Sequence, residues 1–494
     1  MPASPSTARA INDRLALGLL QREGPLTAGQ LKQLTGLSRP TVADLVERLT
    51  ASGLITVVGE AGEQRRGPNA RLYGIVADRA YLAALDVRTE SVSVLVSDLV
   101  GRVLAEGAVP VGPEAGNTAA VEQAVGLVER AVKEAEATGG GRLHTVGIGA
   151  PGLVDPATGE LRDSAGLPAW HRRLGAVLQE RFPDARVSVE NETSLAALAE
   201  QREGVARDRD TFVLLWLGDS PGAAVVLDGS LRRGASGATG EIGFLPVPGT
   251  PVLPSATDCS GGYHSLVGAA AITELAEQCG MAPFDTAAQA VEKATRTTPD
   301  DTDAPLGDTE NGVTGHEAAA LGRRSSSRPI PGAEADPAAP LGRAGNCATS
   351  HGVPAPDNRP VLPSGSRADV DVSAPDRGVG NGAASHDAPA PDHRPDPAPR
   401  AEHSRFLDEL ADRIAVGVAA VVAVLDPGCV VLGGEVGPAG GAALAARVEA
   451  RLRRMSPMAT EVRASTLGGA AVLRGALLTA RERAQDDLFA PPDR

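Results

Sequence analysis

The first 78 residues constrain the chain most, because three short helical patterns are followed there by two strand-like runs around a basic turn. A cap at Thr27 opens the second predicted helix. Ser38 caps the third helix, which carries Pro40 in its first turn and ends at Gly53. The apolar residues predicted to face inward are Ile11, Leu15 and Leu19, then Leu31 and Leu34, then Val42, Leu45, Val46 and Leu49. With strands predicted at 54–58 and 71–75, the pattern indicates a winged helix-turn-helix.

The third predicted helix leaves polar side chains on its outer face. A helix of this kind can enter a major groove, while the turn between the two strands reaches the phosphate backbone or the minor groove. We therefore predict contacts with double-stranded DNA from Ser38, Arg39, Thr41, Arg48, Arg65 and Arg66.

Charge supports this prediction locally. The whole chain has a formal net charge of −15, whereas its first 76 residues hold nine basic and six acidic side chains. Only the N-terminal head is therefore basic. The alternative is a small helical cap or protein-interaction domain with an ordinary solvated charged face.

Composition limits the remaining classes. A chain of 494 residues that is 42% hydrophobic is long enough for two to four domains. No signal sequence opens it, and its longest apolar run, residues 414–425, is too short for a bilayer and contains Gly417. The four cysteines, Cys259, Cys279, Cys347 and Cys429, are far apart, so we expect neither a disulfide framework nor a zinc cluster. We expect a cytoplasmic protein that does not associate with membranes.

One long segment, residues 297–403, is rich in Pro, Gly, Asp, Ser and Ala, and no aromatic residue occurs between Phe284 and Phe406. Such a segment buries too little apolar surface to offset the entropy of ordering, so we predict a disordered insert. It contains an imperfect repeat, residues 350–360 and 385–395, whose histidines lie singly among prolines. Metal binding is one interpretation of these histidines, and solvated low-complexity sequence is the one we favour.

The rest of the chain is α/β. Three strand-like runs, residues 81–87, 91–97 and 103–109, form a predicted antiparallel meander that is followed by a helix and further strands. A second meander begins near residue 211. Two meanders, each followed by helix and strand, indicate a duplication that produces two similar lobes with a cleft between them.

Four motifs in this region resemble landmarks of the ROK family (repressors, open reading frames, kinases). They are residues 146–155 (VGIGAPGLVD), 189–192 (VENE), 237–243 (GATGEIG) and 425–434 (LDPGCVVLGG). The resemblance implies a two-lobed, actin-like ATPase fold. Family repressors carry an N-terminal winged helix-turn-helix, and family kinases lack one.

The turns that hold nucleotide phosphates in the family kinases are altered here. The family pattern Asp-x-Gly-Gly-Thr is replaced by Asp86-Val87-Arg88-Thr89-Glu90, and Gly-Thr-Gly-x-Gly by Gly218-Asp219-Ser220-Pro221-Gly222. Side chains crowd the first turn, where a residue forced into a glycine-only conformation would cost roughly 1 to 3 kcal/mol. In the second turn Asp219 would repel phosphate and Pro221 removes an amide donor. We therefore expect no nucleotide cofactor and no catalytic residues.

The ligand positions of the family are partly retained. The resemblance places Asn191, Glu192, Glu241 and His264 as ligand-binding residues, although His264 stands where the family has a glutamate and Gly166 where it has an asparagine. Glu192 has a second interpretation, because an acid at a helix N-terminus also favours the helix dipole. A lone histidine beside a tyrosine, such as His264, is more often a surface or packing residue than a ligand. Phe244 replaces the histidine of the family's zinc site, and a single thiol cannot make a four-ligand site, so we predict no metal.

Together these inferences predict an α/β protein that is a ROK-type transcriptional regulator, a repressor that binds an operator as a homodimer or higher oligomer and responds to a sugar-like effector. The alternatives are an interaction scaffold with an inert cleft, and an active ATP-dependent sugar kinase. The predicted domains are 1–78 (winged helix-turn-helix), 79–296 (first part of the ROK domain), 297–403 (insert), 404–486 (remainder of the ROK domain) and 487–494 (tail).

Overall fold

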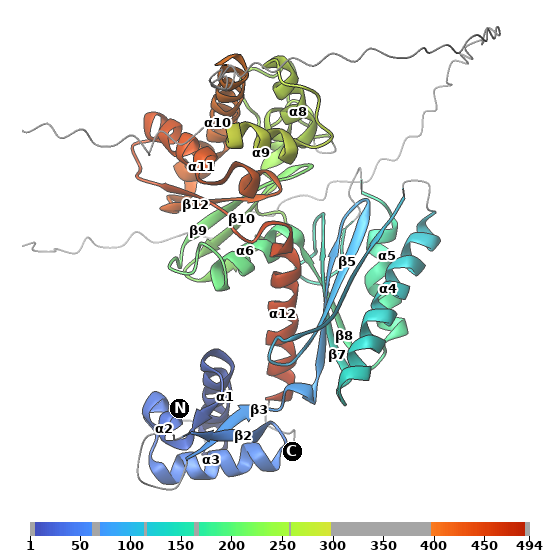
Figure 1. Ribbon diagram of the computed structural model, residues 1–494, viewed down its shortest axis with the longest axis vertical. Coiled ribbons are helices and arrows are strands. Elements are labelled where there is room, and N and C mark those ends of the chain that lie inside the picture. Colours follow the sequence, from blue (N-terminus) through green and yellow to red (C-terminus); the bar gives the residue numbers. More distant parts are fainter. Residues whose placement is uncertain are drawn as a thin grey trace, which may run out of the picture. The chain divides into compact units, whose positions relative to one another are not determined.

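The computed structural model describes residues 5–61, 70–112, 116–162, 167–255, 258–297 and 397–489 (Figure 1). These residues form a small N-terminal head and two α/β lobes. We call residues 80–191 lobe I. Lobe II comprises residues 212–297 and 397–464.

The head consists of three helices and a three-stranded antiparallel sheet of order β1-β3-β2. Its elements are α1 (Pro5–Glu23), β1 (Leu26–Thr27), α2 (Ala28–Thr35), α3 (Arg39–Ala51), β2 (Ile55–Ala61) and β3 (Ala70–Ile75). The predicted caps are confirmed: Thr27 forms a capping box with Gln30, and the Ser38 hydroxyl accepts a hydrogen bond from the Thr41 amide. The head is therefore a winged helix-turn-helix, with β2 and β3 as the wing strands.

The inward face of the first two helices differs from the prediction. Ile11, Leu15 and Leu34 are exposed, with 58%, 42% and 51% of their surfaces accessible. In α1 the buried residues are Ala16, Leu17, Leu19 and Leu20, so the prediction holds for Leu19, and in α2 it holds for Leu31. The one-turn spacing that begins at Ile11 was a misleading guide, since the buried stripe follows Leu17 and Leu20. The stripe predicted for α3 is confirmed, and all four of its residues are buried.

Lobe I is a five-stranded sheet of order β6-β5-β4-β7-β8. Its elements are η1 (Ala77–Arg79), β4 (Tyr81–Val87), β5 (Ser91–Asp98), β6 (Val103–Pro110), α4 (Asn117–Thr138), β7 (Leu143–Ala150), α5 (Trp170–Arg181) and β8 (Arg186–Asn191). The first three strands form the expected antiparallel meander, and β7 and β8 add to it in parallel. Helices α4 and α5 cover one face through an apolar core.

Lobe II repeats this arrangement, with the order β11-β10-β9-β12-β13. Its strands are β9 (Phe212–Leu217), β10 (Pro221–Leu227), β11 (Ser230–Arg232), β12 (Cys429–Gly434) and β13 (Glu461–Ala464). Its helices are η2 (Ile242–Phe244), α7 (His264–Val267), α8 (Ala269–Gln278), α9 (Ala287–Thr297), α10 (Pro397–Leu425) and α11 (Val436–Met455). Again a meander is followed by two parallel strands, so the predicted duplication into two like lobes is confirmed.

Two helices pack between the sheets, α6 (Glu192–Arg202) and α12 (Ala471–Leu488), which follows η4 (Gly468–Ala470). They approach closely, because a Cβ at Gly475 of α12 would lie 2.0 Å from the Leu195 carbonyl oxygen of α6. Helix α12 also lies along β4 and β7 of lobe I (Figure 1). Towards its C-terminal end, Ala480 and Ala484 belong to the same buried cluster as the head.

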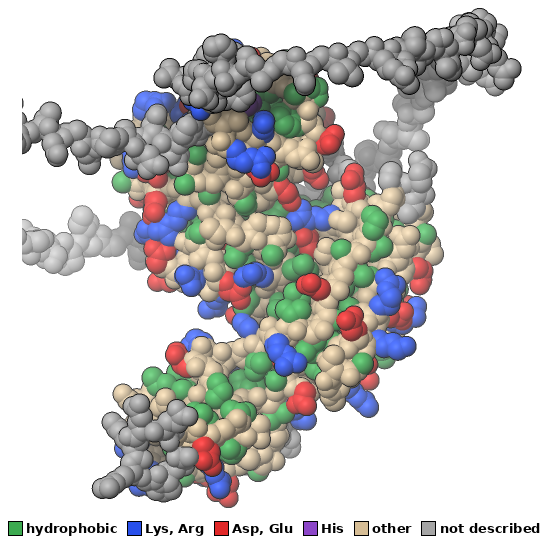
Figure 2. Space-filling model, in the orientation of Figure 1, with side chains coloured by type: hydrophobic (Ala, Val, Ile, Leu, Met, Phe, Trp, Pro, Cys, Tyr) green, Lys and Arg blue, Asp and Glu red, His purple; other side chains and the backbone are tan. Residues whose placement is uncertain are grey.

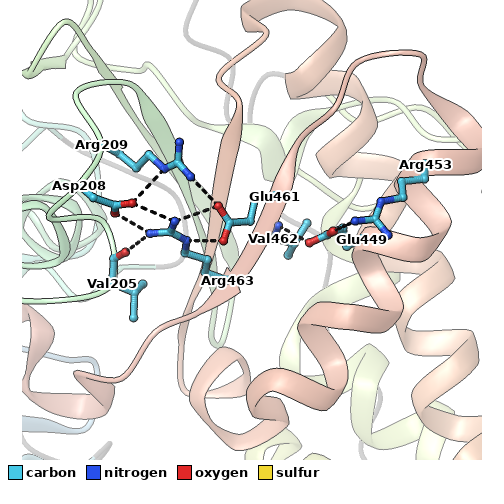
Figure 3. A network of polar contacts seen from close by, with 8 residues as sticks. All are labelled: Val205, Asp208, Arg209, Glu449, Arg453, Glu461, Val462 and Arg463. Carbon is cyan, nitrogen blue, oxygen red and sulfur yellow. Dashed lines mark hydrogen bonds and ion pairs between the residues drawn. The ribbon is translucent and has the colours of Figure 1, made fainter. Parts of the chain in front are cut away.

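The edge strand β13 is held on both sides by polar contacts (Figure 3). Arg463 donates to the Val205 carbonyl oxygen and to Asp208, which both follow α6, and it also pairs with Glu461. On the other side the Val462 amide donates to Glu449 of α11 at 2.9 Å. The Arg463 guanidinium lowers the pKa of the exposed Asp208 carboxyl to about 2. These contacts fix the edge of the lobe II sheet.

The insert is largely outside the described residues. Helix α10 begins at Pro397, inside the segment that we assigned to the insert, and His403 in this helix is buried and hydrogen-bonded to Thr297 of α9. The C-terminal bound of the insert therefore lies before residue 403. Polar residues in the first turns of α10 hid its beginning. Among the described residues, no helix is both long and apolar enough to cross a membrane.

Candidate nucleic-acid interface and interlobe site

The outer surface of α3 is the first candidate site. Ser38 and Arg39 are exposed at its N-terminus and Thr41 is half-buried beside them. The hydroxyl oxygens of Ser38 and Thr41 lie 2.8 Å apart, so both take part in the cap as well as facing outward. The α3 stripe packs into the head core and sets this orientation. A helix N-terminus with exposed hydroxyl and guanidinium groups can donate to phosphates and to base edges.

Arg48 has a different environment from the one predicted. Its guanidinium bonds to Asp13 of α1 at 2.5 Å and also to Asp44 one turn earlier in α3. Burial lowers the pKa of Arg48 and the two carboxylates raise it, with a net upward direction. The structure therefore engages Arg48 in a cross-link between two helices of the head. Spacing along α3 correctly placed it near the outer face, but Asp13 is a partner from another helix.

The two arginines predicted at the wing tip, Arg65 and Arg66, lie outside the described residues. Strand β2, which leads towards them, exposes Val57 and Val58. On the face drawn in Figure 2, basic and acidic side chains are interspersed over the lobes. This face of the lobes therefore offers no single-sign basic surface that would attract a polyanion.

The second candidate site lies where the lobes meet, and it begins at the junction of β8 and α6. Asn191 caps α6, with its Oδ1 accepting from the amides of Thr193 and Ser194. Its Nδ2 donates to the Gly152 carbonyl oxygen at 3.2 Å and to Glu192 Oε2 at 2.6 Å. The Asn191 side chain is thus fully used in holding the helix and aiming Glu192.

Glu192 is partly buried at this junction. Burial raises the pKa of its carboxyl to about 8, with a further upward contribution from Glu241 that is opposed by the field of Arg88. Burial also raises the pKa of Glu241, which follows the tight turn at Gly240 in lobe II. The structure therefore brings these two predicted residues into electrostatic contact. A protonated carboxyl at neutral pH can donate as well as accept a hydrogen bond.

His264 begins α7 in lobe II. Burial lowers the pKa of its imidazole, and its Nδ1 has no hydrogen-bond partner among the described residues. Nearby Cys259 is a free thiol and Phe244 is partly exposed. One thiol and one imidazole do not fit the four-ligand zinc site of the family. Gly166 lies outside the described residues.

The first altered phosphate turn contains no strained residue. Of the described non-glycine residues only Asp228 and Asp426 have positive φ, so the cost that we expected at residues 88–90 is not incurred. The Arg88 amide closes the turn by donating to the Ser91 carbonyl oxygen at 2.8 Å. The backbone of this hairpin has a conformation that residues with side chains adopt without strain. The Arg88 side chain lies beside the turn, where it contacts Asp86 and Glu435.

The second altered turn joins β9 to β10. Asp219 and Ser220 are exposed in it, and Pro221 pairs with Leu217 at the base of the hairpin. A Cβ at Gly218 would lie 2.7 Å from Glu435 Oε2, so a carboxylate already lies against this turn. The residues of the two turns therefore do not fit nucleotide phosphates.

Sequence reasoning missed the ion pairs that join the lobes. Arg88 of lobe I bonds to Glu435 of lobe II, and Arg233 of lobe II bonds to Glu190 of lobe I at 2.5 Å. The replacement of a family glycine by Arg88 was the signal in the sequence, but its partner lies 347 residues away. Two surface hollows, of about 440 and 400 Å³, lie elsewhere, one beside Asp208 and Arg463 and the other beside Gly53 and Arg79.

The head, the duplicated lobes and the position of the altered turns define a winged helix-turn-helix protein with an actin-like, sugar-kinase-type body. The sequence matches the ROK family over residues 82–295 and 398–483, and the MarR family over residues 11–67. The chain therefore belongs to the ROK family, with a MarR-type head.

Curated relatives include repressors. The chain is 26% identical over 239 residues to the xylose repressor of Caldicellulosiruptor bescii, and this alignment covers 48% of this chain and 59% of that protein. It is 23% identical over 251 residues to the xylose repressor of Bacillus spizizenii, covering 50% and 62% respectively. The DNA-binding transcriptional dual regulator NagC of Escherichia coli is 25% identical over 247 residues, covering 48% and 58%. The chain thus spans about 60% of the length of these relatives.

Solved structures support the fold. A ROK family transcriptional regulator described as a homologue of the E. coli MLC protein aligns over 98% of both chains, with a TM-score of 0.62 and 16% identity. A ROK family glucokinase from Streptomyces griseus aligns over 82% of this chain and 100% of that chain, with a TM-score of 0.51 and 19% identity. The regulator thus covers more of this chain than the kinase does.

Proposed function

We propose that this protein is a DNA-binding transcriptional regulator, a repressor, whose kinase-like body no longer transfers phosphate. The observation that carries the proposal is the exposed N-terminus of α3, where Arg39 and the hydroxyl of Ser38 face outward on a capped helix in a winged head. In helix-turn-helix proteins this part of the recognition helix contacts base edges. The repressor names of the relatives agree with this assignment.

DNA contacts are assigned to Ser38, Arg39 and Thr41, with Arg65 and Arg66 on the wing. Arg48 contributes indirectly, since its bonds to Asp13 and Asp44 fix α3 against α1. Removing Arg48 should therefore weaken DNA binding through the stability of the head. Removing Arg39 should weaken it directly.

The lobes are assigned a sensing role. Glu192, Glu241 and His264 offer hydrogen-bonding groups to a small polyhydroxylated ligand, and Asn191 holds Glu192 in place. Non-enzymatic action is supported by the two turns around Arg88 and Gly218, whose side-chain environment opposes phosphate binding. Ligand binding would act by its difference in affinity for two lobe arrangements. Two heads in a homodimer would then be spaced for two half-sites of an operator.

The test is selection of duplex oligonucleotides from a random pool by the full chain. We expect a recurrent motif with two related halves, whose enrichment is lost in Arg39→Ala. A pool that stays random with the folded wild-type chain would contradict DNA recognition.

A measurement of ATP turnover distinguishes a regulator from an active sugar kinase. With ATP, Mg²⁺ and a panel of sugars, the full chain should produce ADP at the rate of the protein-free control. Sugar-dependent turnover would assign the body to catalysis. Thermal unfolding against the same sugars separates a sensor from an inert scaffold, because a ligand at a hundred times its Kd adds about 2.7 kcal/mol of stability.

A further inference from the structure

Arg88 stands at the turn between β4 and β5 and reaches from lobe I into lobe II. Its Nε donates to both carboxylate oxygens of Asp86, at 3.0 and 3.1 Å. Its Nη1 donates to Glu435 Oε1, immediately before α11. The guanidinium carbon lies 5.6 Å from the ring centroid of Trp216 on β9, within the range of a cation–π contact. One side chain therefore contacts two elements of lobe II.

The Arg88–Glu435 pair occupies the region between the two altered turns. Glu435 follows Gly434, whose positive φ turns the chain from β12 towards α11. The second carboxylate oxygen of Glu435 and the Trp216 indole nitrogen both lie within 3 Å of a Cβ built on Gly218. The turn at residues 86–90 thus supplies the Arg88 guanidinium, and the Glu435 carboxylate covers the turn at residues 218–222.

Removal of Arg88 alone is unfavourable, because its guanidinium balances the charge of two carboxylates. Asp86 is buried, and burial raises the pKa of its carboxyl against the opposing effect of Arg88. Burial lowers the pKa of the Arg88 guanidinium, whereas Asp86 and Glu435 raise it. The net direction is upward. Loss of the guanidinium would leave Asp86 buried without a cation. The Arg88 side chain is 31% exposed, so salt screens its pair with Glu435 only in part.

A second contact joins the lobes elsewhere on the same boundary. Arg233, which follows β11, donates to Glu190 Oε2 from Nε at 2.8 Å and from Nη2 at 2.5 Å. Nearby, a Cβ at Gly237 would lie 2.1 Å from the Val154 carbonyl oxygen, so the backbones of the two lobes approach closely. Arginines from opposite lobes each bind a carboxylate of the other lobe.

We propose that Arg88 is a clasp, which joins Asp86 of lobe I to Glu435 and Trp216 of lobe II and holds the two lobes together. The Glu190–Arg233 pair is the second support of the same arrangement. Any transition that separates the lobes at this point must break the Arg88–Glu435 contact. This step rests on the proposed sensing function: a ligand that moves the lobes apart at this point must break the clasp.

The test measures the distance between the lobes in the full chain without DNA. Spin labels are placed at Glu134→Cys on α4 and Glu277→Cys on α8, with Cys259→Ser and Cys347→Ser preventing labelling elsewhere. Double electron–electron resonance should give one narrow distance distribution for the parent chain. Arg88→Ala should broaden it and add a second population of at least a fifth of the molecules.

Glu435→Gln keeps the size of the side chain and removes its charge, so it should produce the same second population. The double variant should add little to either single change, because both remove one contact. The control is Arg181→Ala, which removes an exposed ion pair with Glu129 inside lobe I and should leave the distribution narrow.

An unchanged distribution in folded Arg88→Ala would overturn the clasp. If Arg88→Ala does not fold, an unchanged distribution in Glu435→Gln would overturn it equally. DNA affinity is measured separately on the same proteins. Failure of DNA binding with a broadened distance would reject the regulator and retain the clasp.

Discussion

At the residue scale, two side chains have roles that their position in the sequence did not reveal. Asn191 and Arg48 were both predicted to contact a ligand or DNA, and both are bonded within the protein. A helix pattern gives the direction of a side chain along its own helix. It does not give partners from other helices, such as Asp13, which decide whether a charged group is free.

We expect Arg48→Ala to lower the free energy of unfolding of the head by about 1 to 2 kcal/mol, because it leaves Asp13 partly buried without its cation. Arg39→Ala should change this free energy by less than about 0.5 kcal/mol, since Arg39 is exposed. Thermal unfolding of the two variants distinguishes them. Equal stability of Arg48→Ala and wild type would show that the Arg48 cross-link does not stabilise the head.

The raised pKa of Glu192 makes stability depend on pH. The folded pKa is about 8 and the ordinary value is 4.5, so the folded state holds the proton more tightly than the unfolded chain. Its contribution is complete below pH 4.5 and is lost as the pH rises towards 8. Glu192→Gln should therefore reduce the loss of stability between pH 5 and pH 8 by roughly 1 to 3 kcal/mol.

Urea unfolding at both pH values measures this difference. Glu136→Gln, on the exposed face of α4, is the matched control and should follow the wild type. If Glu192→Gln has the same pH slope as wild type, the carboxyl is not buried in the way described.

At the element scale, the central pair of helices shows how close packing depends on small residues. A Cβ at Gly475 of α12 would lie 2.0 Å from a backbone oxygen of α6, so a side chain at this position would force the two helix backbones apart. Gly475→Ala should lower the free energy of unfolding by about 2 to 4 kcal/mol. The control is Gly126→Ala in α4, where the nearest atom is the end of a flexible arginine 3.5 Å away.

Gly126→Ala should be neutral or stabilise the chain by up to about 1 kcal/mol, because alanine favours a helix interior over glycine. Chemical denaturation of both variants measures the contrast. Similar stabilities for the two would mean that α6 and α12 do not pack as closely as described.

Most elements could be predicted from local patterns. The three strands of the first meander and the caps at Thr27 and Ser38 follow from alternation and from residue type, and these strands were placed within one residue. The buried face of α1 could not be predicted in this way. The face of α1 that is buried depends on tertiary packing, because its buried residues belong to an apolar cluster that extends to Ala480 of α12.

The start of α10 was missed for a similar reason. Its first turns are rich in proline and charge, and its place in lobe II is shown by contacts in space, where His403 is buried against Thr297 and where Phe406 and Leu407 join the core of the lobe. The interlobe ion pairs join residues hundreds of positions apart, which no local pattern can reveal. The resemblance to the ROK family named Glu192 and Glu241 as candidate ligand-binding residues, but it did not reveal the ion pairs that surround them.

At the scale of the whole molecule, α12 connects the parts. It packs on α6 and on the sheet of lobe I, and Ala480 and Ala484 lie in the core cluster of the head. Arg14 of α1 also pairs with Asp486 near the end of α12. Packed contacts therefore run without a break from the lobes through α12 to the head, and we propose that a rearrangement of the lobes acts on DNA binding along this route.

We propose that α3 of this ROK protein contacts DNA. A titration of a duplex that carries the selected motif, with wild type and with Arg39→Ala at 50 and 200 mM salt, tests this proposal. We expect wild-type affinity to fall by about 10³-fold or more over this range, as phosphate contacts release counterions. Arg39→Ala should bind more weakly and with a smaller salt dependence. Equal affinity for the two proteins, unchanged by salt, would contradict this proposal.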